Sequence, residues 1–359
     1  MTRAVTLTLY DWTLVALVLL VTGVGLLNLA SAAPEPRLWQ MQVGFVGVAG
    51  IAAVALQLFR RKQVMGWAYG LYALSLLLLA LVLVWGREVN GAKAWFVLGP
   101  LRFQPSEFAK IALILALARL LDRRELRGVW DYLPPLLLAA PPILLTAMEP
   151  DLGGAMVMAG IVAGMLFIRG LPLKHILVAL GLVGVLVPTV VWPNLKPYQQ
   201  ERILVVLNPA RDPLGSGFQV IQSMIAIGSG GIWGKGYGEG TQSQLGFIPE
   251  RQTDFVFSVL AEEMGFVGAV TLLLLYAGLF YRLAVMAVEV IHVGDRLVIG
   301  GVLSFIAFQV LVNVGVTLGL APVTGITLPL MSYGGTSLLS TYVALGLALL
   351  VYRDRFRDV

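Results

Sequence analysis

The feature that most constrains this chain is a series of long apolar segments separated by charged or Pro- and Gly-rich ones. Each is about as long as the roughly 20 residues that a helix needs to cross a membrane. Hydrophobic residues make up 58% of the 359 residues and charged residues only 13%, whereas a soluble domain is about 45–50% apolar and about 25% charged. A soluble globule cannot bury such an excess, so we expect an integral membrane protein.

The apolar pattern predicts an all-α polytopic membrane protein with ten transmembrane helices, forming one domain over residues 1–359. The expected spans lie at about 11–32, 39–59, 64–85, 105–121, 130–148, 152–168, 173–192, 254–281, 297–317 and 335–352. The first run is too long for the core of a signal peptide and lacks a convincing cleavage site, so we expect it to be retained as the first helix.

The basic residues predict the orientation, because cytoplasmic loops of membrane proteins are enriched in Lys and Arg. With a cytoplasmic amino terminus, the inner segments contain Arg60, Arg61, Lys62, Arg119, Arg123, Arg124, Arg127, Arg169, Lys174, Arg282, Arg296, Arg353, Arg355 and Arg357. The short outer loops at 31–38, 149–151 and 318–334 contain only Arg37. Both termini are therefore expected in the cytoplasm. Residues 86–104 and a large extracytoplasmic loop, residues 193–253 between helices 7 and 8, are expected outside.

Charge and residue usage exclude several classes of function. The net charge of +5 does not indicate nucleic-acid binding, because the basic residues lie between apolar runs instead of forming one face. The absence of cysteine excludes disulfides, thiolate metal sites and cysteine nucleophiles. Only two histidines, His175 and His292, are present, which argues against a His-rich metal site. Chemistry is expected from carboxylates, Lys, Arg and hydroxyl groups.

Function is expected in the large outer loop, which is too long to be a simple connector. Residues 215–240 contain nine glycines around a short apolar run, residues 218–227, that suits a helix lying at the membrane interface. Glycines at this density allow positive φ angles and close approach of the backbone to a ligand. The alternative is that this Gly-rich segment is only a flexible loop.

A few ionisable residues lie where the expected helices end on the outer side, and each needs a partner, water or a function. Glu107 and Lys110 share one helix face, Asp151 follows Glu149 in a tight turn, and Asp254 lies at the outer end of the eighth span. Simpler roles are open for each. Glu107 and Lys110 can neutralise each other, Asp151 can cap a helix, and Thr253 with Asp254 can cap the eighth helix. The position of Asp254 directly after the Gly-rich segment favours a functional role.

Two further patterns concern the carboxyl-terminal half. Glu262 and Glu263 lie deeper in the eighth span, about 12–14 Å along its axis from Asp254 at 1.5 Å per residue, and are expected to pair inside the bundle. Residues 313–337 contain Pro322, Pro329 and several glycines at a membrane boundary. Such a broken segment is tolerated only when protein buries it or when it lines water, so we expect a cavity wall instead of a plain turn.

Several motifs resemble those of the SEDS family, which includes RodA, FtsW and SpoVE. They lie at residues 212–219, 222–223, 226–231, 249–250, 253–255, 262–265 and 313–337. The resemblance extends over nearly the whole chain and includes the plan of ten spans. Residues 240–247 with Glu250, and residues 332–337, resemble RodA more than FtsW.

The resemblance implies a peptidoglycan glycosyltransferase that polymerises lipid II, an undecaprenyl-pyrophosphate-linked disaccharide pentapeptide, during cell elongation. It implies a place in the bacterial cytoplasmic membrane with the active site facing outside. It also implies work beside a class B penicillin-binding protein and other proteins of the elongation complex, with no nucleic acid involved. The family's catalytic residue carries over to Asp254 in Thr253-Asp254-Phe255.

The residues suggest a mechanism in which Asp254 is the general base, since a carboxylate in a partly dry cavity can have a raised pKa. The residues expected to bind substrate are Glu107, Lys110, Asp151, Arg211, Lys235, Glu250 and Arg251. The four basic ones are candidate contacts to the pyrophosphate, together with Gly-rich backbone amides. A divalent cation, Mg²⁺ or Mn²⁺, is a possible cofactor, with Asp254, Glu107 or Asp151 as its oxygen ligands.

Two other functions fit part of the pattern. A flippase that moves lipid II across the membrane would also need polar residues in apolar helices and a large cavity. A non-catalytic scaffold for a penicillin-binding protein would need only the helices. The outer clustering of the charges, the outer Gly-rich segment and the lack of an evident internal repeat favour the enzyme.

Overall fold

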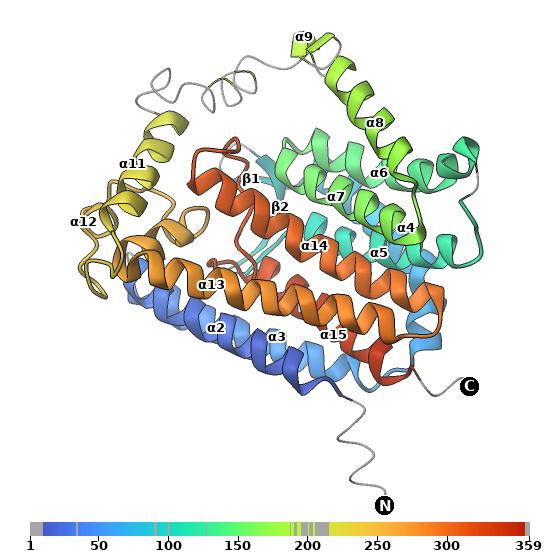
Figure 1. Ribbon diagram of the computed structural model, residues 1–359, viewed down its shortest axis with the longest axis horizontal. Coiled ribbons are helices and arrows are strands. Elements are labelled where there is room, and N and C mark those ends of the chain that lie inside the picture. Colours follow the sequence, from blue (N-terminus) through green and yellow to red (C-terminus); the bar gives the residue numbers. More distant parts are fainter. Residues whose placement is uncertain are drawn as a thin grey trace, which may run out of the picture.

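The computed structural model describes residues 10–33, 35–89, 92–99, 101–126, 128–186, 188–189, 192–194, 200, 204 and 215–355. A bundle of long helices forms its main body (Figure 1). These helices are α2 (Trp12–Ala32), α3 (Pro36–Leu56), α4 (Arg61–Trp85), α5 (Pro105–Asp122), α6 (Leu133–Met148), α7 (Leu152–Arg169), α8 (Leu173–Leu186), α13 (Val256–Glu289), α14 (Val293–Thr317) and α15 (Gly335–Arg353). The shorter helices are η1 (Val129–Tyr132), α9 (Trp192–Asn194), α11 (Ser216–Ser229) and α12 (Thr241–Gln244).

The expectation of a mostly helical membrane protein is confirmed. Eight of the described helices are long and apolar enough to cross a membrane. Helix α5 is not among them because four of its 18 residues are charged, and the described part of α8 has only 14 residues. The number of ten spans therefore stays a prediction.

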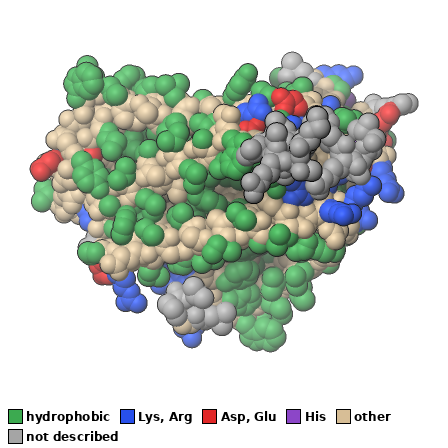
Figure 2. Space-filling view, turned by 90° about the horizontal axis from the view of Figure 1, so that it is seen from below, with side chains coloured by type: hydrophobic (Ala, Val, Ile, Leu, Met, Phe, Trp, Pro, Cys, Tyr) green, Lys and Arg blue, Asp and Glu red, His purple; other side chains and the backbone are tan. Residues whose placement is uncertain are grey.

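Large apolar side chains cover the outside of the bundle, as lipid contact requires. Ile51, Val54 and Tyr281 are each at least 70% exposed. Figure 2 shows apolar side chains spread over one face of the molecule, with charged side chains gathered toward its edges. Inside, α3 packs against α15, α14 against α7 and α2 against α13, so helices far apart in sequence share one core.

Within the described residues, the segment at 86–104 departs from an all-α protein. It forms a three-stranded antiparallel sheet in the order β1-β2-β3, with β1 at Arg87–Val89, β2 at Ala92–Leu98 and β3 at Leu101–Phe103. The strands are short, and Gly99 takes a φ of 62° between β2 and β3. A search for long apolar runs does not detect such short strands. The sheet leads into α5, which begins at Pro105.

Helix α13 is broken at Gly265, where φ is 65° and ψ is −163°. Four backbone hydrogen bonds of 2.8–3.1 Å replace those that the helix loses: Lys235 donates to Glu262, Gly236 to Glu263, Phe266 to Gly231 and Val267 to Ile232. The Gly-rich segment therefore supplies hydrogen-bond partners to the peptide groups that the break leaves without helical partners.

Gly234 shows why this segment contains glycine. Its φ is 82°, and a Cβ atom there would lie 2.1 Å from the carbonyl oxygen of Glu263. The glycines do permit close backbone approach, as expected. The backbone that Gly234 approaches is that of α13 in the same chain.

Residues 318–334 cross the bundle without regular secondary structure, and many of them are buried. A Cβ atom on Gly25 of α2 would lie 2.7 Å from the carbonyl oxygen of Leu330, and one on Gly153 of α7 would lie 2.6 Å from that of Thr324. This segment, which we call the crossing loop, is enclosed by helices from both halves of the chain. A broken segment is tolerated when protein encloses it in this way. The expectation that this segment forms a cavity wall stays a prediction.

The two ends of the bundle differ in content. The terminal end holds the start of α2 and the end of α15, and both chain termini lie there (Figure 1). Three ion pairs join buried carboxylates at this end: Arg282 with Asp11, Arg61 with Asp295, and Arg353 with Asp354. The opposite end, which we call the glycine end, holds α11, α12 and the start of α13 (Figure 1).

Candidate active site

Asp254 lies in the turn at 251–255 that leads into α13 at the glycine end, and it is half-buried. Its backbone N–H donates to the carbonyl oxygen of Glu250 at 3.1 Å. Helix α13 has its N-cap at Phe255, and no side chain makes a cap hydrogen bond there. Neither Thr253 nor Asp254 therefore occupies the N-cap position of this helix.

The carboxyl-terminal quarter fixes the backbone on both sides of Asp254. Three successive carbonyl oxygens accept hydrogen bonds. The backbone N–H of Tyr333 donates to the carbonyl oxygen of Gln252 at 2.8 Å, and Ser332 Oγ donates to that of Thr253 at 2.6 Å. Asn313 Nδ2 donates to that of Asp254 at 2.9 Å. Buried polar backbone that is paired in this way is rigid and specific. The position of the Asp254 backbone is thus set by the crossing loop and α14.

Asn313 has the central place in this arrangement. It is 1% exposed, and its Nδ2 also donates to the carbonyl oxygen of Ile326 at 2.8 Å. One side-chain amide therefore joins α14, the crossing loop and the turn that carries Asp254. Its Oδ1 atom is buried without a hydrogen-bond partner.

Glu107 and Lys110 form the ion pair that their spacing predicts. Lys110 Nζ lies 2.7 Å from Glu107 Oε1, and the two residues are 2% and 7% exposed, respectively. Ser340 Oγ of α15 donates to the second carboxylate oxygen at 2.8 Å, and Lys110 Nζ lies 5.2 Å from the ring centroid of Phe305. The pair is desolvated and satisfied by α15, so it is held in one geometry.

Asp151 is the N-cap of α7, and its Oδ1 accepts a hydrogen bond from the backbone of Gly154 at 2.7 Å. The capping alternative is therefore confirmed. Its other oxygen accepts bonds from Gln104 Nε2 at 3.0 Å and Ser106 Oγ at 3.2 Å. Burial raises the pKa of Asp151, while the Gly154 bond and the charge of Lys110 oppose this shift.

The acidic groups at this end are linked through the crossing loop. Asp151 senses the charges of both Glu107 and Lys110, so these three residues form one cluster. The next residues of α7 touch the crossing loop at Thr324, and Asn313 binds the same loop at Ile326 and the backbone of Asp254. The structure thus connects the α5–α7 cluster to Asp254 through this loop.

Glu149 was expected only to flank the turn, but it is fully buried, and neither carboxylate oxygen has a hydrogen-bond partner. Burial, with a smaller contribution from the charge of Asp151, raises the pKa of Glu149 to about 9. Its carboxyl group is therefore protonated at neutral pH. Burial cannot be read from its sequence neighbourhood, which is polar and rich in turn-forming residues.

The remaining expected site residues have separate environments. Glu250 is half-buried and accepts a bond from Thr253 Oγ1 at 3.1 Å, so it shapes the Asp254 turn. Arg251 is half-buried, and its Nη1 atom lacks a hydrogen-bond partner. Burial lowers the pKa of Arg251, and the charge of Glu263 opposes this shift. Arg211 lies outside the described residues.

Lys235 pairs with Glu262 across the break in α13, with 2.7 Å between Nζ and Oε1. Glu262 is fully buried and also accepts bonds from the backbone N–H groups of Gln242 and Ser243 at 2.8 and 3.0 Å. The expectation of a structural, paired role for Glu262 is confirmed. Lys235 Nζ keeps a bond of 2.7 Å to Thr241 Oγ1 as well.

A resident metal ion would need several oxygen ligands that are not already occupied. Among the described residues there is no group of three or more His, Cys, Asp or Glu side chains that could hold one. Both oxygens of Glu107 and both oxygens of Asp151 already accept hydrogen bonds. These residues do not form a cage for a resident metal ion.

Polar side chains that sequence reasoning did not single out complete the site. Asn28 of α2 donates to the carbonyl oxygen of Val256 at 2.8 Å, and Gln42 of α3 donates to that of Ser332 at 3.0 Å. Both are at most 2% exposed. The signal that would have found them is an amide residue inside an otherwise apolar span, which must find a polar partner.

Comparisons with known proteins agree with this architecture. The chain matches the family model FTSW_RODA_SPOVE, described as "Cell cycle protein", over residues 2–356. It is 40% identical over 329 residues to the peptidoglycan glycosyltransferase MrdB of Escherichia coli, covering 89% of this chain and 86% of the relative. It is 38% identical over 361 residues to the stage V sporulation protein E of Bacillus subtilis, covering 96% and 97%.

Solved structures give the same result. A chain from a structure on the coordination of polymerization and crosslinking by a peptidoglycan synthase complex matches with a TM-score of 0.87 and 54% identity, covering 97% of this chain and 99% of that chain. The rod shape determining protein RodA of Thermus thermophilus matches with a TM-score of 0.76 and 45% identity, covering 97% and 98%. The chain is thus an integral membrane protein with a RodA-like fold, and it belongs to the FtsW/RodA/SpoVE family of cell-cycle proteins.

Proposed function

We propose that the chain is a peptidoglycan glycosyltransferase that joins lipid II units into glycan strands, with Asp254 as the general base. The C4 hydroxyl of the acceptor sugar attacks C1 of the donor sugar, and a C1–O bond forms as the bond from C1 to the pyrophosphate breaks. The hydroxyl proton passes to the Asp254 carboxylate. Undecaprenyl pyrophosphate leaves.

The fixed backbone of Asp254 is the observation that supports this role best. A general base must lie within hydrogen-bond reach of the proton that it removes, so its position has to be defined. Asn313, Ser332 and Tyr333 hold the backbone from residue 252 to residue 254. Half-burial of Asp254 gives it both a partly dry environment and access.

The leaving pyrophosphate needs positive charge and hydrogen-bond donors. Arg251 supports such a role best, because its buried Nη1 has no partner and it lies three residues before Asp254. Lys110 has three N–H donors, of which Glu107 takes one, so the ion pair orients Lys110 while leaving it able to donate. Glu107, Asp151 and Glu250 then act by positioning these groups. Lys235 and Arg211 remain candidates for the same contact.

A divalent cation, Mg²⁺ or Mn²⁺, would be held chiefly by the substrate's phosphates. Mg²⁺ usually binds through one or two carboxylates together with phosphates and water. Asp254 is the protein ligand that we propose, since the carboxylates of Glu107 and Asp151 are occupied. No step above depends on the ion.

The membrane plan completes the proposal. We infer ten spans, cytoplasmic termini and a glycine end that faces the outside of the bacterial cytoplasmic membrane, because the basic residues gather at the terminal end. The partner that we propose is a class B penicillin-binding protein of the elongation complex, which would crosslink the glycan strands. The similarity to a chain of a peptidoglycan synthase complex supports such a partnership.

Polymerisation of lipid II by the purified full chain tests the proposal, with and without the penicillin-binding protein and Mg²⁺. Asp254→Asn and Asp254→Ala should each lower the rate by about 10²–10⁴-fold, the usual contribution of a general base. Glu239→Gln, which alters an exposed carboxylate of the Gly-rich segment, is the matched control and should keep the wild-type rate. Wild-type rates in both Asp254 variants would remove this residue from the mechanism.

The same assay separates the two alternatives. A flippase or a scaffold would leave lipid II unpolymerised in detergent, where no bilayer has to be crossed and no transpeptidase is present. Glycan strands formed by the chain alone would therefore exclude both. The clustering of Asp254, Arg251 and Glu250 in one turn at the glycine end supports an enzyme more than a path across the membrane.

A further inference from the structure

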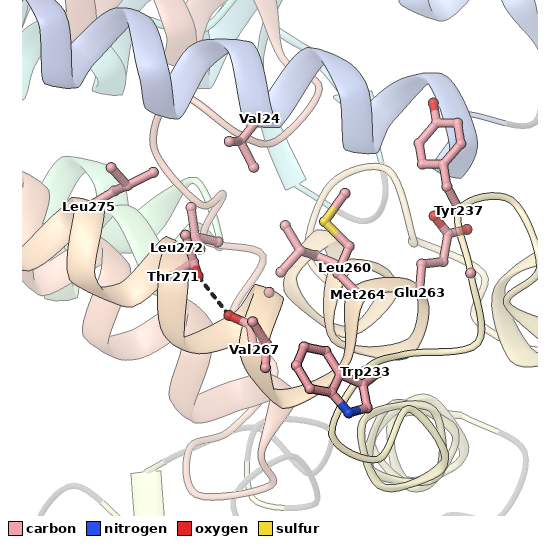
Figure 3. Close-up of a pocket in the computed structure, with 12 residues that line it drawn as sticks. Val24, Trp233, Tyr237, Leu260, Glu263, Met264, Val267, Thr271, Leu272 and Leu275 are labelled. Atoms are coloured by element: carbon pink, nitrogen blue, oxygen red, sulfur yellow. Dashed lines mark hydrogen bonds between the residues drawn. The ribbon is translucent and has the colours of Figure 1, made fainter.

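A groove of about 480 Å³ runs along the outside of α13 at its break (Figure 3). Its walls are mainly apolar and include Val24 of α2 and Leu260, Met264, Leu272 and Leu275 of α13. Trp233 and Tyr237 of the Gly-rich segment border it and are 80% and 53% exposed. Trp and Tyr side chains favour the level of lipid head groups, so this end of the groove belongs at the membrane interface.

Among the described residues that line this groove, Glu263 is the charged one. It is 2% exposed, and its Oε1 accepts hydrogen bonds from Ser31 Oγ and, at 3.5 Å, from Gln244 Nε2. Its Oε2 is buried without any hydrogen-bond partner. A buried carboxylate oxygen that lacks a partner is costly, which points to a donor that is supplied from outside the chain.

The dimensions of the groove suit one lipid chain. From Glu263 to Leu275 the helix rises about 18 Å at 1.5 Å per residue. Half of a hydrocarbon core about 30 Å thick is about 15 Å. A chain that starts at the level of Glu263 would therefore follow the groove through one leaflet.

We propose that this groove is a binding site for a phospholipid with a primary ammonium head group. The ammonium donates to the free oxygen of Glu263, and an acyl chain lies against Val24, Leu272 and Leu275. Such a bond satisfies a buried acceptor with a charged donor, which is the strongest type of hydrogen bond. Nothing in the proposed glycosyl transfer uses Glu263.

The charge of the groove distinguishes an ammonium phospholipid from lipid II. Lipid II carries a pyrophosphate, and the Glu263 carboxylate would repel that group from the head of this groove. The charge of Glu263 acts on Arg251, which is assigned above to the pyrophosphate. An ammonium lipid complements the groove, whereas an anionic polyprenyl lipid does not.

The test uses the full chain in nanodiscs and a phosphatidylethanolamine with a photoreactive acyl chain. Adducts should map to residues 256–275. Thr271→Trp fills the groove and should lower labelling severalfold, whereas Leu274→Trp places the same side chain on the same helix outside the groove. Equal labelling of these two variants would contradict the site.

Head-group selectivity tests Glu263 itself. Competition by unlabelled phosphatidylethanolamine should exceed that by phosphatidylcholine about tenfold in the wild type, which corresponds to about 1.4 kcal/mol for one charged hydrogen bond. Glu263→Gln should reduce this ratio to about one while the Thr271→Trp effect persists. A ratio that Glu263→Gln leaves unchanged, or stronger competition by undecaprenyl phosphate than by phosphatidylethanolamine, would overturn the proposal.

Discussion

The terminal end and the glycine end both bury carboxylates, but they treat them differently. At the terminal end, Asp11 accepts bonds from Arg282 and from the backbone of Leu14, and Asp295 pairs with Arg61. At the glycine end, Glu149 has no hydrogen-bond partner, and Glu263 has one for only one of its two oxygens. Glu107, Asp151 and Glu262 are paired at the glycine end as well. Among the described residues, the difference between the two ends therefore lies in Glu149 and Glu263.

Paired and unpartnered buried groups have different consequences for the fold. A buried ion pair whose partners are both present fixes the relative positions of helices, although it contributes little net stability. A buried polar atom without a partner costs free energy and is retained where a ligand or a reaction needs it. Arg251 Nη1, Asn313 Oδ1 and Thr324 Oγ1 add to this set of unpartnered atoms around the Asp254 turn. Gln57 Oε1 and His292 Nε2 at the terminal end also lack partners, so the contrast between the two ends holds for carboxylate oxygens.

The largest effect is expected where the Gly-rich segment meets α13. Gly234→Ala places a Cβ atom 2.1 Å from the carbonyl oxygen of Glu263 at a φ of 82°, and it should cost more than about 4 kcal/mol or prevent folding. Gly238→Ala is the matched control, because its φ is 77° but no atom lies within 4 Å. It should cost only about 1–2 kcal/mol of backbone strain. Thermal unfolding in detergent measures both, and equal losses would show that contact with α13 is unimportant.

Substitutions in the ion pairs of the terminal end should lower stability without lowering the rate of polymerisation. Arg61→Ala leaves Asp295, which is 2% exposed, without its ion-pair partner and should cost about 3–5 kcal/mol. The double variant Arg61→Ala with Asp295→Asn should recover part of this loss, because no uncompensated charge remains. The polymerisation rate per folded molecule should stay near wild type in both. A rate loss as large as that of Asp254→Asn would remove the distinction between the two ends.

Glu149 at the glycine end should make the free energy of unfolding depend on pH. Its pKa is about 9 in the folded protein against 4.5 in the unfolded chain, so the unfolded state releases this proton first. The contribution of Glu149 to stability is therefore most favourable below about pH 4.5 and is lost as pH rises toward about 9. Glu149→Gln keeps the shape without the proton, and it should raise the free energy of unfolding by about 1–3 kcal/mol at pH 8 and by little at pH 5. A gain that is equal at both pH values would mean that Glu149 is ionised in the fold.

Sequence reasoning located the helices and the acidic positions but not their partners. Apolar runs of membrane length identify α2, α13 and α14, because lipid sets the length of a span. The spacing of Glu107 and Lys110 predicts their ion pair, since three residues along a helix bring side chains to one face. Span length and i,i+3 spacing are local properties of the sequence, so a local pattern is enough to predict them.

Long-range contacts explain what was missed. The break at Gly265 arises because residues 231–236 bond to the helix from outside, and nothing within the span itself reveals this. Likewise, Gln42 and Asn28 reach Ser332 and Val256 from more than two hundred residues away. The role of Glu149 depends on burial by other helices, which its polar neighbours conceal.

The smallest effect that we predict tests how Asp254 is positioned. Asn313→Ala removes the amide that binds the carbonyl oxygens of Asp254 and Ile326, and it should lower kcat about tenfold, or about 1.4 kcal/mol, with little change in KM. Gln309→Ala is the control on the same helix, since Gln309 is 2% exposed and its Oε1 has no partner. It should change stability but not kcat. If both variants lose stability equally and neither changes kcat, Asn313 supports only the fold. A loss of kcat in Asn313→Ala alone would show that the backbone carbonyl contact sets the reach of the Asp254 carboxylate.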